Sequence, residues 1–414
     1  MIAEILSTGD EVRSGALVDS NSAYIAEVLE EAGFEVARHS TVGDDLPAIS
    51  SVLKEIGFRA DVAVVTGGLG PTTDDLTAEA AAKAGGVELR EDPVALLYME
   101  NFFRKRNWLI TALNRKQALL PEGAKCLENP VGTAPGFALK IGKGIFFFLP
   151  GVPSEMKKML NEKVLPEISG LWGGSREFSL VRNISTFGLG EAAVNENLLE
   201  VIKDHPSVRV GLRATFPEIH VKLYARGKDE KEVSSLLDKA TEGVVEKLGN
   251  RILSTAGESM EVVAGGLLKR KKATLAVAES CTGGLVSNMI TNIPGSSDYF
   301  LFSGVAYSNE SKIKALGVDR AVIEKYGAVH EETAKEMAAC ARRIAGATYG
   351  LSTTGIAGPS GGTAEKPVGT VCIGLATPEE TKGFRYTFPF RDRLMNKKLF
   401  AVMALEILRR ELQK

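Results

Sequence analysis

The sequence is poor in the residues that build metal-bound and disulfide-bonded proteins. Its 414 residues include four cysteines and four histidines, and the cysteines form no CxxC pair. Their wide separation excludes a Cys/His zinc site and a disulfide framework, so we expect a reducing compartment. The histidines are equally scattered, which argues against a His-centred catalytic triad. Proton chemistry in an enzyme of this composition falls to carboxylates, lysine, serine or tyrosine.

The chain also lacks an excess of either charge and any long apolar run. Lys and Arg number 50 against 52 Asp and Glu, a formal net charge of −2. This balance excludes a globally basic nucleic-acid binder, although not a local basic patch. No apolar run approaches the roughly 18 residues that a membrane span needs. The first residues lack the basic region of a signal peptide, so we expect a cytoplasmic protein that binds no membrane.

The order of predicted elements divides the chain into three domains. Residues 1–170 alternate strands and helices, which predicts a mostly parallel sheet with helices on both faces. The Gly-rich stretch 170–175 is a candidate linker. Residues 171–255 have the β-α-β-β-α-β order of a small α+β domain. Residues 256–414 alternate again and predict a third domain of the α/β class.

A glycine loop follows the buried strand expected near Val65. Its glycines are Gly67, Gly68 and Gly70. Such a loop lets backbone N–H groups approach a phosphate, and a helix expected from about Asp74 adds its positive end. Asp74 and Asp75 together could hold a divalent cation beside that phosphate. The alternative is a structural turn in which one aspartate is only the N-cap of the helix.

Three other segments could converge on this loop. Gly9 and Glu11 follow the first strand at its C-terminal end, where ligands bind in open α/β sheets. Asp44 follows the second strand. Asn114 and Arg115 begin a run of two amides and two cations. Taken separately, the acids could be helix caps or solvated residues, and the last run could be a solvated helix face.

A serine at a strand–helix junction is the first signal in the C-terminal domain. Ser280 lies in the stretch AESCTGG, between an expected strand and a helix expected from Gly283. There its Oγ would lie near helix N–H groups that stabilise an anion. It could instead be only the N-cap. Cys281 is interpreted as a small packed thiol, because no suitable histidine motif accompanies it.

Lys312 is the second signal, and it follows another strand. If the strands are parallel, Lys312 lies on the same side of the sheet as Ser280, and Ser with Lys is a known alternative to Ser with His. The amine would have to be neutral, whereas an ordinary surface lysine is charged and solvated. Residues 353–362 supply hydroxyls and glycines for a phosphate or ribose, or form a flexible turn. Residues 391–393 offer a phosphate clamp or a surface ion pair.

Together these motifs resemble the CinA family of competence/damage-inducible proteins. The N-terminal motifs are STGDE (7–11), GGLGPTTDD (67–75), NRKQ (114–117), NPVGTAPG (129–136) and LPGVP (149–153). The C-terminal motifs are AESCTGG (278–284), YSNESK (307–312), TTGIAGPSGG (353–362), KPVGT (366–370) and FRDR (390–393). The resemblance implies a doubly wound molybdopterin-binding-like domain, a KH-like middle domain and an α/β deamidase domain. The chain departs from the family pattern at Arg391, where the family commonly has glycine.

For the C-terminal domain, the resemblance implies a nicotinamide mononucleotide deamidase that needs no cofactor. Ser280 matches the nucleophile and Lys312 its general base. The matching substrate contacts are Tyr307, Thr354 and Arg393, with Thr282, Gly283, Gly355 and Gly358 beside them.

For the N-terminal domain, the resemblance implies metal-dependent hydrolysis of the ADP-ribose pyrophosphate. The expected metal ligands are Asp44, Asp74 and Asp75, with Mg, Mn or Co as the candidate ion. The expected nucleotide contacts are Gly9, Glu11, Gly67, Gly68, Gly70, Asp74, Asp75, Asn114 and Arg115. The alternative is a pterin- or nucleotide-binding regulatory protein of competence or DNA damage response, without N-terminal catalysis.

The middle domain carries no comparable chemical motif. Residues 176–253 hold twelve Lys and Arg and twelve Asp and Glu, and no GxxG loop joins two expected helices. Both features argue against RNA binding, so a rigid connector or dimer element is the preferred role. We expect small nucleotides as ligands, no nucleic-acid partner, and a homodimer.

Overall fold

The computed structural model describes residues 1–171 and 178–414. The chain divides into two compact units, Met1–Val181 with Ala225–Leu237 and Arg182–Tyr224 with Asp238–Lys414. No helix among the described residues is both long and apolar enough to cross a membrane.

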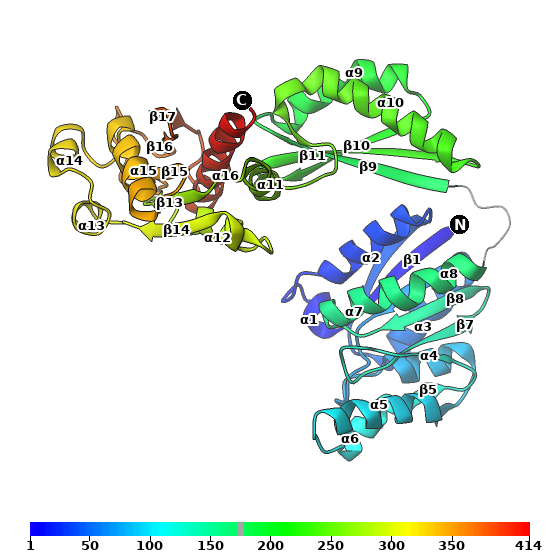
Figure 1. The fold of residues 1–414 in the computed structure, drawn as a ribbon. Coiled ribbons are helices and arrows are strands. Elements are labelled where there is room, and N and C mark those ends of the chain that lie inside the picture. Colours follow the sequence, from blue (N-terminus) through cyan, green and yellow to red (C-terminus); the bar gives the residue numbers. More distant parts are fainter. Residues whose placement is uncertain (172–177) are drawn as a thin grey trace. The chain divides into compact units, whose positions relative to one another are not determined.

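A six-stranded sheet forms the centre of the N-terminal domain (Figure 1). Its strands follow the order β2 (Glu35–Val42), β1 (Ile2–Thr8), β3 (Val62–Thr66), β8 (Gly144–Leu149), β7 (Gly136–Ile141) and β6 (Lys125–Leu127). The first four strands run parallel, and the last two pair antiparallel. The mostly parallel sheet predicted from the sequence is therefore confirmed.

Successive side chains of the parallel strands enter two separate hydrophobic cores. In β3, Val62 and Val64 face one core, whereas Ala63 and Val65 face the other. This period of two arises when an extended strand is buried on both faces. The first core is covered by α2 (Ser20–Glu31), α7 (Pro153–Met159) and α8 (Leu165–Leu171). The second is covered by α3 (Leu46–Arg59), α4 (Thr77–Gly85) and α5 (Pro93–Lys105).

Short elements complete the N-terminal domain. They are α1 (Asp10–Arg13), β4 (Leu89–Glu91), α6 (Ala112–Arg115), β5 (Leu119–Pro121) and the single turns Lys116–Ala118 and Leu160–Val164. Two features differ from the sequence-based expectation. The helix expected from Asp74 begins at Thr77, and α5 was not expected at all. Its start was readable, because Asp92 accepts hydrogen bonds from the first-turn amides and Pro93 follows as the first helical residue.

The middle domain has the predicted β-α-β-β-α-β order. Its sheet has the order β10 (Arg209–Thr215), β11 (Glu218–Gly227), β9 (Phe178–Phe187) and β12 (Ile252–Ser254). Its helices are α9 (Glu191–Asp204) and α10 (Glu230–Leu248), with a single turn at Gly249–Arg251. Most of the candidate linker 170–175 lies outside the described residues, and so does Glu177, where the first strand was expected to begin.

The C-terminal domain is built on a five-stranded sheet. Its strands follow the order β14 (Phe300–Val305), β13 (Leu275–Glu279), β15 (Tyr349–Gly355), β16 (Thr370–Ala376) and β17 (Thr381–Thr387). β14, β13 and β15 run parallel, whereas β16 and β17 are antiparallel. The carboxyl ends of β13 and β14, from which Ser280 and Lys312 follow, therefore lie at the same edge.

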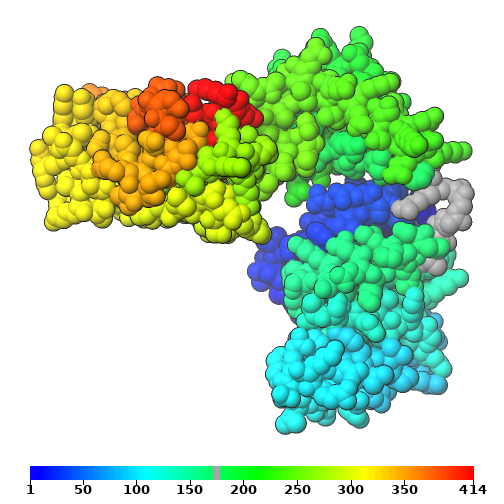
Figure 2. Space-filling model, in the orientation of Figure 1, coloured from blue at the N-terminus to red at the C-terminus, as the bar shows by residue number. Residues whose placement is uncertain are grey.

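Helices cover both faces of this sheet as well. In β13, Val277 enters one core with α11 (Met260–Lys271), α12 (Leu285–Thr291) and α16 (Arg393–Leu412). Ala276 and Ala278 enter the other core with α14 (Arg320–Tyr326) and α15 (Glu331–Ala345). α13 (Asn309–Lys314) and the single turn Ser296–Asp298 complete the domain. Most residues of α16 are buried, and the red atoms in Figure 2 mark the part of the chain's C-terminal end that is seen from this side.

Candidate active sites

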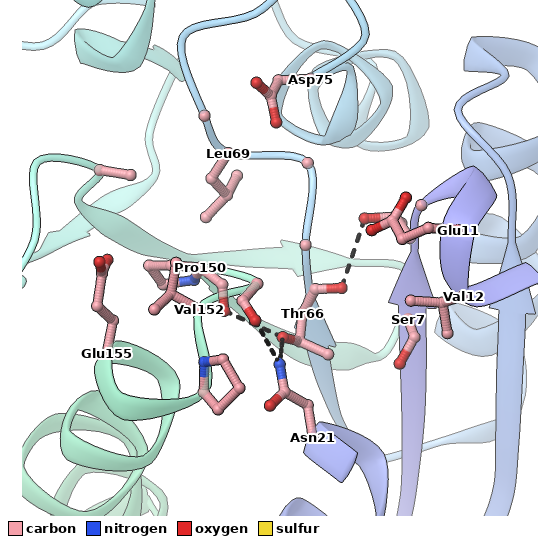
Figure 3. A pocket seen from close by; sticks show the side chains of 18 of the residues that line it. Ser7, Glu11, Val12, Asn21, Thr66, Leu69, Asp75, Pro150, Val152 and Glu155 are labelled. Atoms are coloured by element: carbon pink, nitrogen blue, oxygen red, sulfur yellow. Dashed lines mark hydrogen bonds between the residues drawn. The ribbon is translucent and has the colours of Figure 1, made fainter. Parts of the chain in front are cut away.

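The largest N-terminal hollow lies where β1 and β3 end and where the loop after β8 begins. It has a volume of about 520 Å³. Among the residues expected to bind nucleotide, those on its wall are Gly9, Glu11, Gly67, Gly68, Gly70, Asp74 and Asp75. Glu11 and Glu155 lie on opposite sides of the hollow in Figure 3. The topology thus brings together segments that are more than 100 residues apart in the chain.

The glycine loop is held tightly against the end of β1. Gly67 has φ +106°, and a Cβ on it would lie 2.3 Å from the Thr8 carbonyl oxygen. Gly68 has φ +63°, and a Cβ there would lie 2.1 Å from the Thr77 hydroxyl. Only glycine fits such a backbone path. The hydroxyls of Thr8 and Thr77 lie 3.0 Å apart, and this contact links the end of β1 beside the loop to the first residue of α4.

Acidic groups gather beside this loop, where Arg13 pairs with Asp10 and Lys116 lowers the pKa of Asp74, but no Lys or Arg is among the described residues on the wall of the hollow. The pKa of Asp44 is raised by burial and by repulsion from Asp10, Glu11 and Asp74, against the lowering effect of the Asp10 amide. Carboxylate oxygens suit a hard divalent cation. The described residues nevertheless contain no group of three or more His, Cys, Asp or Glu side chains placed to hold a metal ion. A cation that keeps one or two carboxylates and takes other ligands from bound phosphates fits this arrangement.

Asp75 has a local role that differs from its expected one. Its carboxylate accepts hydrogen bonds from the Thr72 amide at 2.8 Å and the Thr72 hydroxyl at 2.5 Å. It therefore closes a turn ahead of α4. Neither Asp74 nor Asp75 is the N-cap, which is Leu76. Asp44 is consequently the better candidate for a metal, with Asp74 beside it, although hydrogen bonding by Thr72 and by its own backbone lowers the pKa of Asp74.

The run from Asn114 to Gln117 reaches the loop through its last two residues. Asn114 and Thr111 form a capping box at the start of α6, which occupies the Asn114 side chain. Neither Asn114 nor Arg115 lines the hollow. Lys116 instead donates to the Thr72 carbonyl, and Gln117 lies on the wall. Because Asn114 and Arg115 belong to the short helix α6, their side chains do not reach the hollow. The sequence did not indicate this orientation.

Two wall residues with side-chain hydrogen bonds, Asn21 and Glu155, were not expected from the sequence. Asn21 donates to the Thr66 hydroxyl at 3.1 Å and to the Gly151 carbonyl at 2.8 Å, which ties α2 to the loop after β8 (Figure 3). Glu155 accepts from the Asn129 amide at 2.7 Å. Asn129 and Glu155 lie in or beside the motifs NPVGTAPG and LPGVP, so those motifs were the available signal.

Ser280 and Lys312 are in direct contact in the C-terminal domain. Lys312 Nζ lies 2.8 Å from Ser280 Oγ, 2.9 Å from the Ala306 carbonyl oxygen and 3.2 Å from the Tyr307 carbonyl oxygen. Lys312 is 1% exposed and Ser280 is 7% exposed. The lysine is therefore not a solvated surface residue, although that is the usual state of lysine.

Burial makes the neutral amine of Lys312 more available than it is for a lysine in water. Burial lowers the pKa of Lys312 from its ordinary value of 10.5, and the thiol of Cys281 opposes this shift. A neutral amine can donate its two hydrogens to the carbonyls of Ala306 and Tyr307. Its lone pair is then directed to the hydroxyl hydrogen of Ser280. This is the arrangement that a lysine base requires.

Ser280 is not the N-cap of α12. The helix begins at Leu285 with Gly284 as its N-cap, two residues later than expected, because Gly283 and Gly284 have positive φ. The carboxylate of Glu279 caps the helix instead. It accepts from the amides of Gly284, Val286 and Ser287 at 2.8, 3.2 and 2.9 Å. Glu279 is fully buried and also accepts from the hydroxyl of Thr282.

A hollow of about 210 Å³ opens at the dyad. Besides Ser280 and Lys312, its wall includes Cys281, Tyr307, Ala328, Val329, Thr354, Gly355, Ala357 and Arg393. Arg393 donates to the Tyr307 hydroxyl at 2.8 Å and to the Gly358 carbonyl at 2.7 Å. Thr282, Gly283 and Gly358, which were expected to contact substrate, do not line this hollow. Thr282 is buried between Glu279 and Thr353.

Cys281 is packed rather than reactive. It is buried, and burial raises the pKa of its thiol to about 12. A thiol with such a pKa is almost entirely protonated at neutral pH and is a poor nucleophile. This agrees with its interpretation as a small packed residue.

Comparison with known proteins covers the whole chain. Residues 4–170 match the model of a probable molybdopterin binding domain, residues 181–253 that of the damage-inducible protein CinA KH domain, and residues 257–412 that of the CinA C-terminal domain. A CinA-like protein of Desulfosudis oleivorans is 52% identical over 412 residues, covering 100% of both chains. A CinA-like protein of Desulforapulum autotrophicum is 47% identical over 416 residues, covering 100% of this chain and 98% of the other.

Among solved structures, one match is titled the protein CinA with unknown function from Thermoplasma acidophilum. It is 37% identical, covers 40% of this chain and 97% of its own, and has a TM-score of 0.37. The full-length identities to CinA-like proteins and the three domain matches, in the same order as the sheets described above, lead to one conclusion. The chain belongs to the CinA family.

Proposed function

We propose that the C-terminal domain hydrolyses nicotinamide mononucleotide to nicotinic acid mononucleotide and ammonia. The observation that carries this proposal is the buried 2.8 Å contact between Lys312 Nζ and Ser280 Oγ at the floor of an open hollow. A serine hydroxyl becomes a useful nucleophile only when a base takes its proton, and a desolvated lysine can do so.

In the first half of the reaction, Lys312 takes the Ser280 hydroxyl proton while Oγ bonds to the carboxamide carbon. The tetrahedral oxyanion then collapses, the C–N bond breaks, and the Lys312 ammonium protonates the departing amide nitrogen, which leaves as ammonia. An ester to Ser280 remains. In the second half, Lys312 takes a proton from water, whose oxygen attacks the ester carbon. The acid leaves, and the proton returns to Ser280 Oγ.

The oxyanion needs hydrogen-bond donors close to Ser280. The amides of Gly283 and Gly284 are already bonded, to the Ser280 carbonyl at 3.2 Å and to the Glu279 carboxylate at 2.8 Å. The Cys281 and Thr282 amides are therefore the candidate donors. Two such N–H groups in a fixed turn supply the electrostatic stabilisation that acyl transfer uses.

Arg393 and Tyr307 are the candidate contacts for the phosphate of the substrate. Both line the hollow, and the Arg393 guanidinium is already oriented by the Tyr307 hydroxyl and the Gly358 carbonyl. A guanidinium matches phosphate oxygens in shape and charge. Thr354 lies on the same wall, and its hydroxyl donates to the Ala328 carbonyl.

The N-terminal hollow favours a second activity, metal-dependent hydrolysis of ADP-ribose at its pyrophosphate. The specific observation is the hollow of about 520 Å³ in which Glu11, Asp44 and Asp74 line the wall beside the glycine loop. Asp44 and Asp74 would hold a divalent ion such as Mg, Mn or Co together with the phosphates. When bound, the ion would neutralise the diphosphate and activate water. Tight nucleotide or pterin binding without turnover would favour the regulatory alternative instead.

Purified protein should be incubated with nicotinamide mononucleotide and ADP-ribose in parallel, and the products identified by mass. The Ser280→Ala and Lys312→Ala variants should lose ammonia release by more than about 1,000-fold, because each removes half of the nucleophilic unit. Lys314→Ala is the matched control, since this exposed lysine lies two positions further along α13. Full ammonia release by a folded Ser280→Ala protein would overturn the proposal.

A further inference from the structure

The tip of the middle-domain hairpin packs into the C-terminal domain. β10 and β11 pair antiparallel through Thr215 and Glu218, so the connecting residues are Phe216 and Pro217. Phe216 packs against the C-terminal hydrophobic core, and its ring meets that of Phe390 edge to face, with centroids 5.4 Å apart at 82°. Such aromatic pairs contribute specific geometry in addition to buried area. Both rings belong to the second compact unit.

Glu218 holds the same tip from its other side. Its carboxylate is almost fully buried, and Oε1 accepts a hydrogen bond from the Met260 amide at 3.2 Å, at the first residue of α11. The ring of Phe216 and the carboxylate of Glu218 thus fasten the turn to two different segments. A hairpin fastened twice has little freedom to shift against the domain it touches.

Phe390 is connected in turn to the wall of the dyad hollow. Its carbonyl accepts from the Asn396 side chain at 2.9 Å, and Asn396 also donates to the Ala357 carbonyl at 3.0 Å. Asn396 is fully buried in the first turns of α16. Arg393 lies three residues after Phe390 and donates to the Gly358 carbonyl. The segment before α16 is therefore held by three contacts. They are made by the ring of Phe216, by the side chain of Asn396 and by the loop after β15.

We propose that Phe216 is a positioning residue for substrate, which acts through Phe390 to hold Arg393 over the hollow. The inference rests on the proposed deamidase function. No described residue of the middle domain lines the hollow, so an effect on substrate has to pass through the segments that the hairpin tip contacts, of which the one at Phe390 leads to Arg393. Residues 388–392 form no helix or strand, and external packing must fix their path. Ser280 and Lys312 are held separately, by β13 and α13.

The test compares Phe216→Ala, Phe216→Leu and Leu199→Ala with the unchanged full-length chain. In Phe216→Ala the KM for nicotinamide mononucleotide should rise by about tenfold, the effect of weakening one charge-assisted contact, with little change in kcat. The KM for nicotinamide riboside, which lacks the phosphate, should stay unchanged. Phe216→Leu should restore most of the affinity, and Leu199→Ala should behave as unchanged protein, because Leu199 is 57% exposed on α9.

Hydrogen exchange of residues 388–396 gives a readout that does not need turnover. Phe216→Ala should speed exchange there, whereas Leu199→Ala should not. An unchanged KM together with unchanged exchange in folded Phe216→Ala would overturn the inference. If the unchanged chain fails to hydrolyse nicotinamide mononucleotide, the proposed function fails. In that case hydrogen exchange alone tests the positioning role. Faster exchange of residues 388–396 in Phe216→Ala supports this role, and unchanged exchange overturns it.

Discussion

At the scale of single residues, Lys312 is the group whose state decides the chemistry. Its amine is enclosed by Ser280 and by the carbonyls of Ala306 and Tyr307. Burial lowers the pKa of Lys312 from 10.5, which makes the basic form more available at neutral pH. The motif YSNESK marked the position of this lysine but not its burial, which depends on how α13 closes over the end of β14.

The lowered pKa predicts a pH dependence for ammonia release. The rate should be lost as pH falls through the pKa of Lys312, because the protonated amine cannot take the Ser280 proton, and should be fully present above it. The midpoint should lie below 10.5. A kcat/KM profile for nicotinamide mononucleotide measures this directly.

Lys312→Arg gives the control for this profile. A guanidinium keeps the charge and the donors but cannot lose a proton in proteins. The variant should therefore be inactive at every pH. An active Lys312→Arg protein, or a rate independent of pH, would remove Lys312 as the base.

At the scale of elements, the turn between β13 and α12 differs from its sequence-based expectation. The motif AESCTGG indicated a strand–helix junction, but helix propensity could not show that Gly283 and Gly284 take positive φ. The helix consequently starts at Leu285, and the capping role passes from Ser280 to Glu279. The mostly parallel N-terminal sheet and the helices on both of its faces were predictable, because buried parallel strands and amphipathic helices have distinct hydrophobic periods.

The N-terminal domain likewise has features that the sequence predicted and features that it did not. The glycine loop was predictable from its motif, whereas the roles of Asp75 and Asn114 were not. Each of these side chains is used by a local turn, the first by Thr72 and the second by Thr111. Such Asx-type contacts compete with ligand binding for the same side chain. Only the backbone conformation decides between them.

Replacement of Glu279 tests the element that carries Ser280. Its two carboxylate oxygens accept hydrogen bonds from Thr282, Gly284, Val286 and Ser287. Glu279→Gln replaces one carboxylate oxygen with an NH2 group, so the donors that face this group lose their hydrogen-bond acceptor. We expect unfolding free energy to fall by about 1–3 kcal/mol and kcat to fall with the displaced Ser280.

Ser287→Ala is the matched control for that change, because it removes one hydroxyl donor to Glu279, together with the Ser303 contact of that hydroxyl, and leaves the carboxylate in place. Thermal unfolding and kcat should both change less in this variant than in Glu279→Gln. Equal kcat in Glu279→Gln and unchanged protein would show that the turn does not depend on the carboxylate.

At the scale of the whole molecule, two chemically different sites occur in one chain. The N-terminal hollow combines a glycine loop with unbalanced acids, whereas the C-terminal hollow combines a buried dyad with Arg393. The near-neutral net charge of −2 is compatible with both, because each site places its charges locally. The scarcity of histidine agrees with a chain whose proposed proton chemistry uses lysine and aspartate.

The two sites should respond separately to metal removal. Chelation with EDTA should abolish AMP release from ADP-ribose and leave ammonia release unchanged. Asp44→Asn should lower AMP release by on the order of tenfold or more, because it removes one of the carboxylates proposed to hold the ion. Product analysis by mass, with Mg, Mn or Co restored in turn, measures both reactions. Loss of both activities in Asp44→Asn would indicate misfolding or a shared site, contrary to the account.

The most direct test of the central claim is to capture the ester on Ser280. Protein mixed with nicotinamide mononucleotide should be quenched in acid within milliseconds to seconds, digested, and examined by mass spectrometry. The account predicts an adduct of the nucleotide acyl group, less ammonia, on the peptide that spans β13 and α12, located on Ser280. An adduct on Cys281, or full turnover by Ser280→Ala, would contradict it.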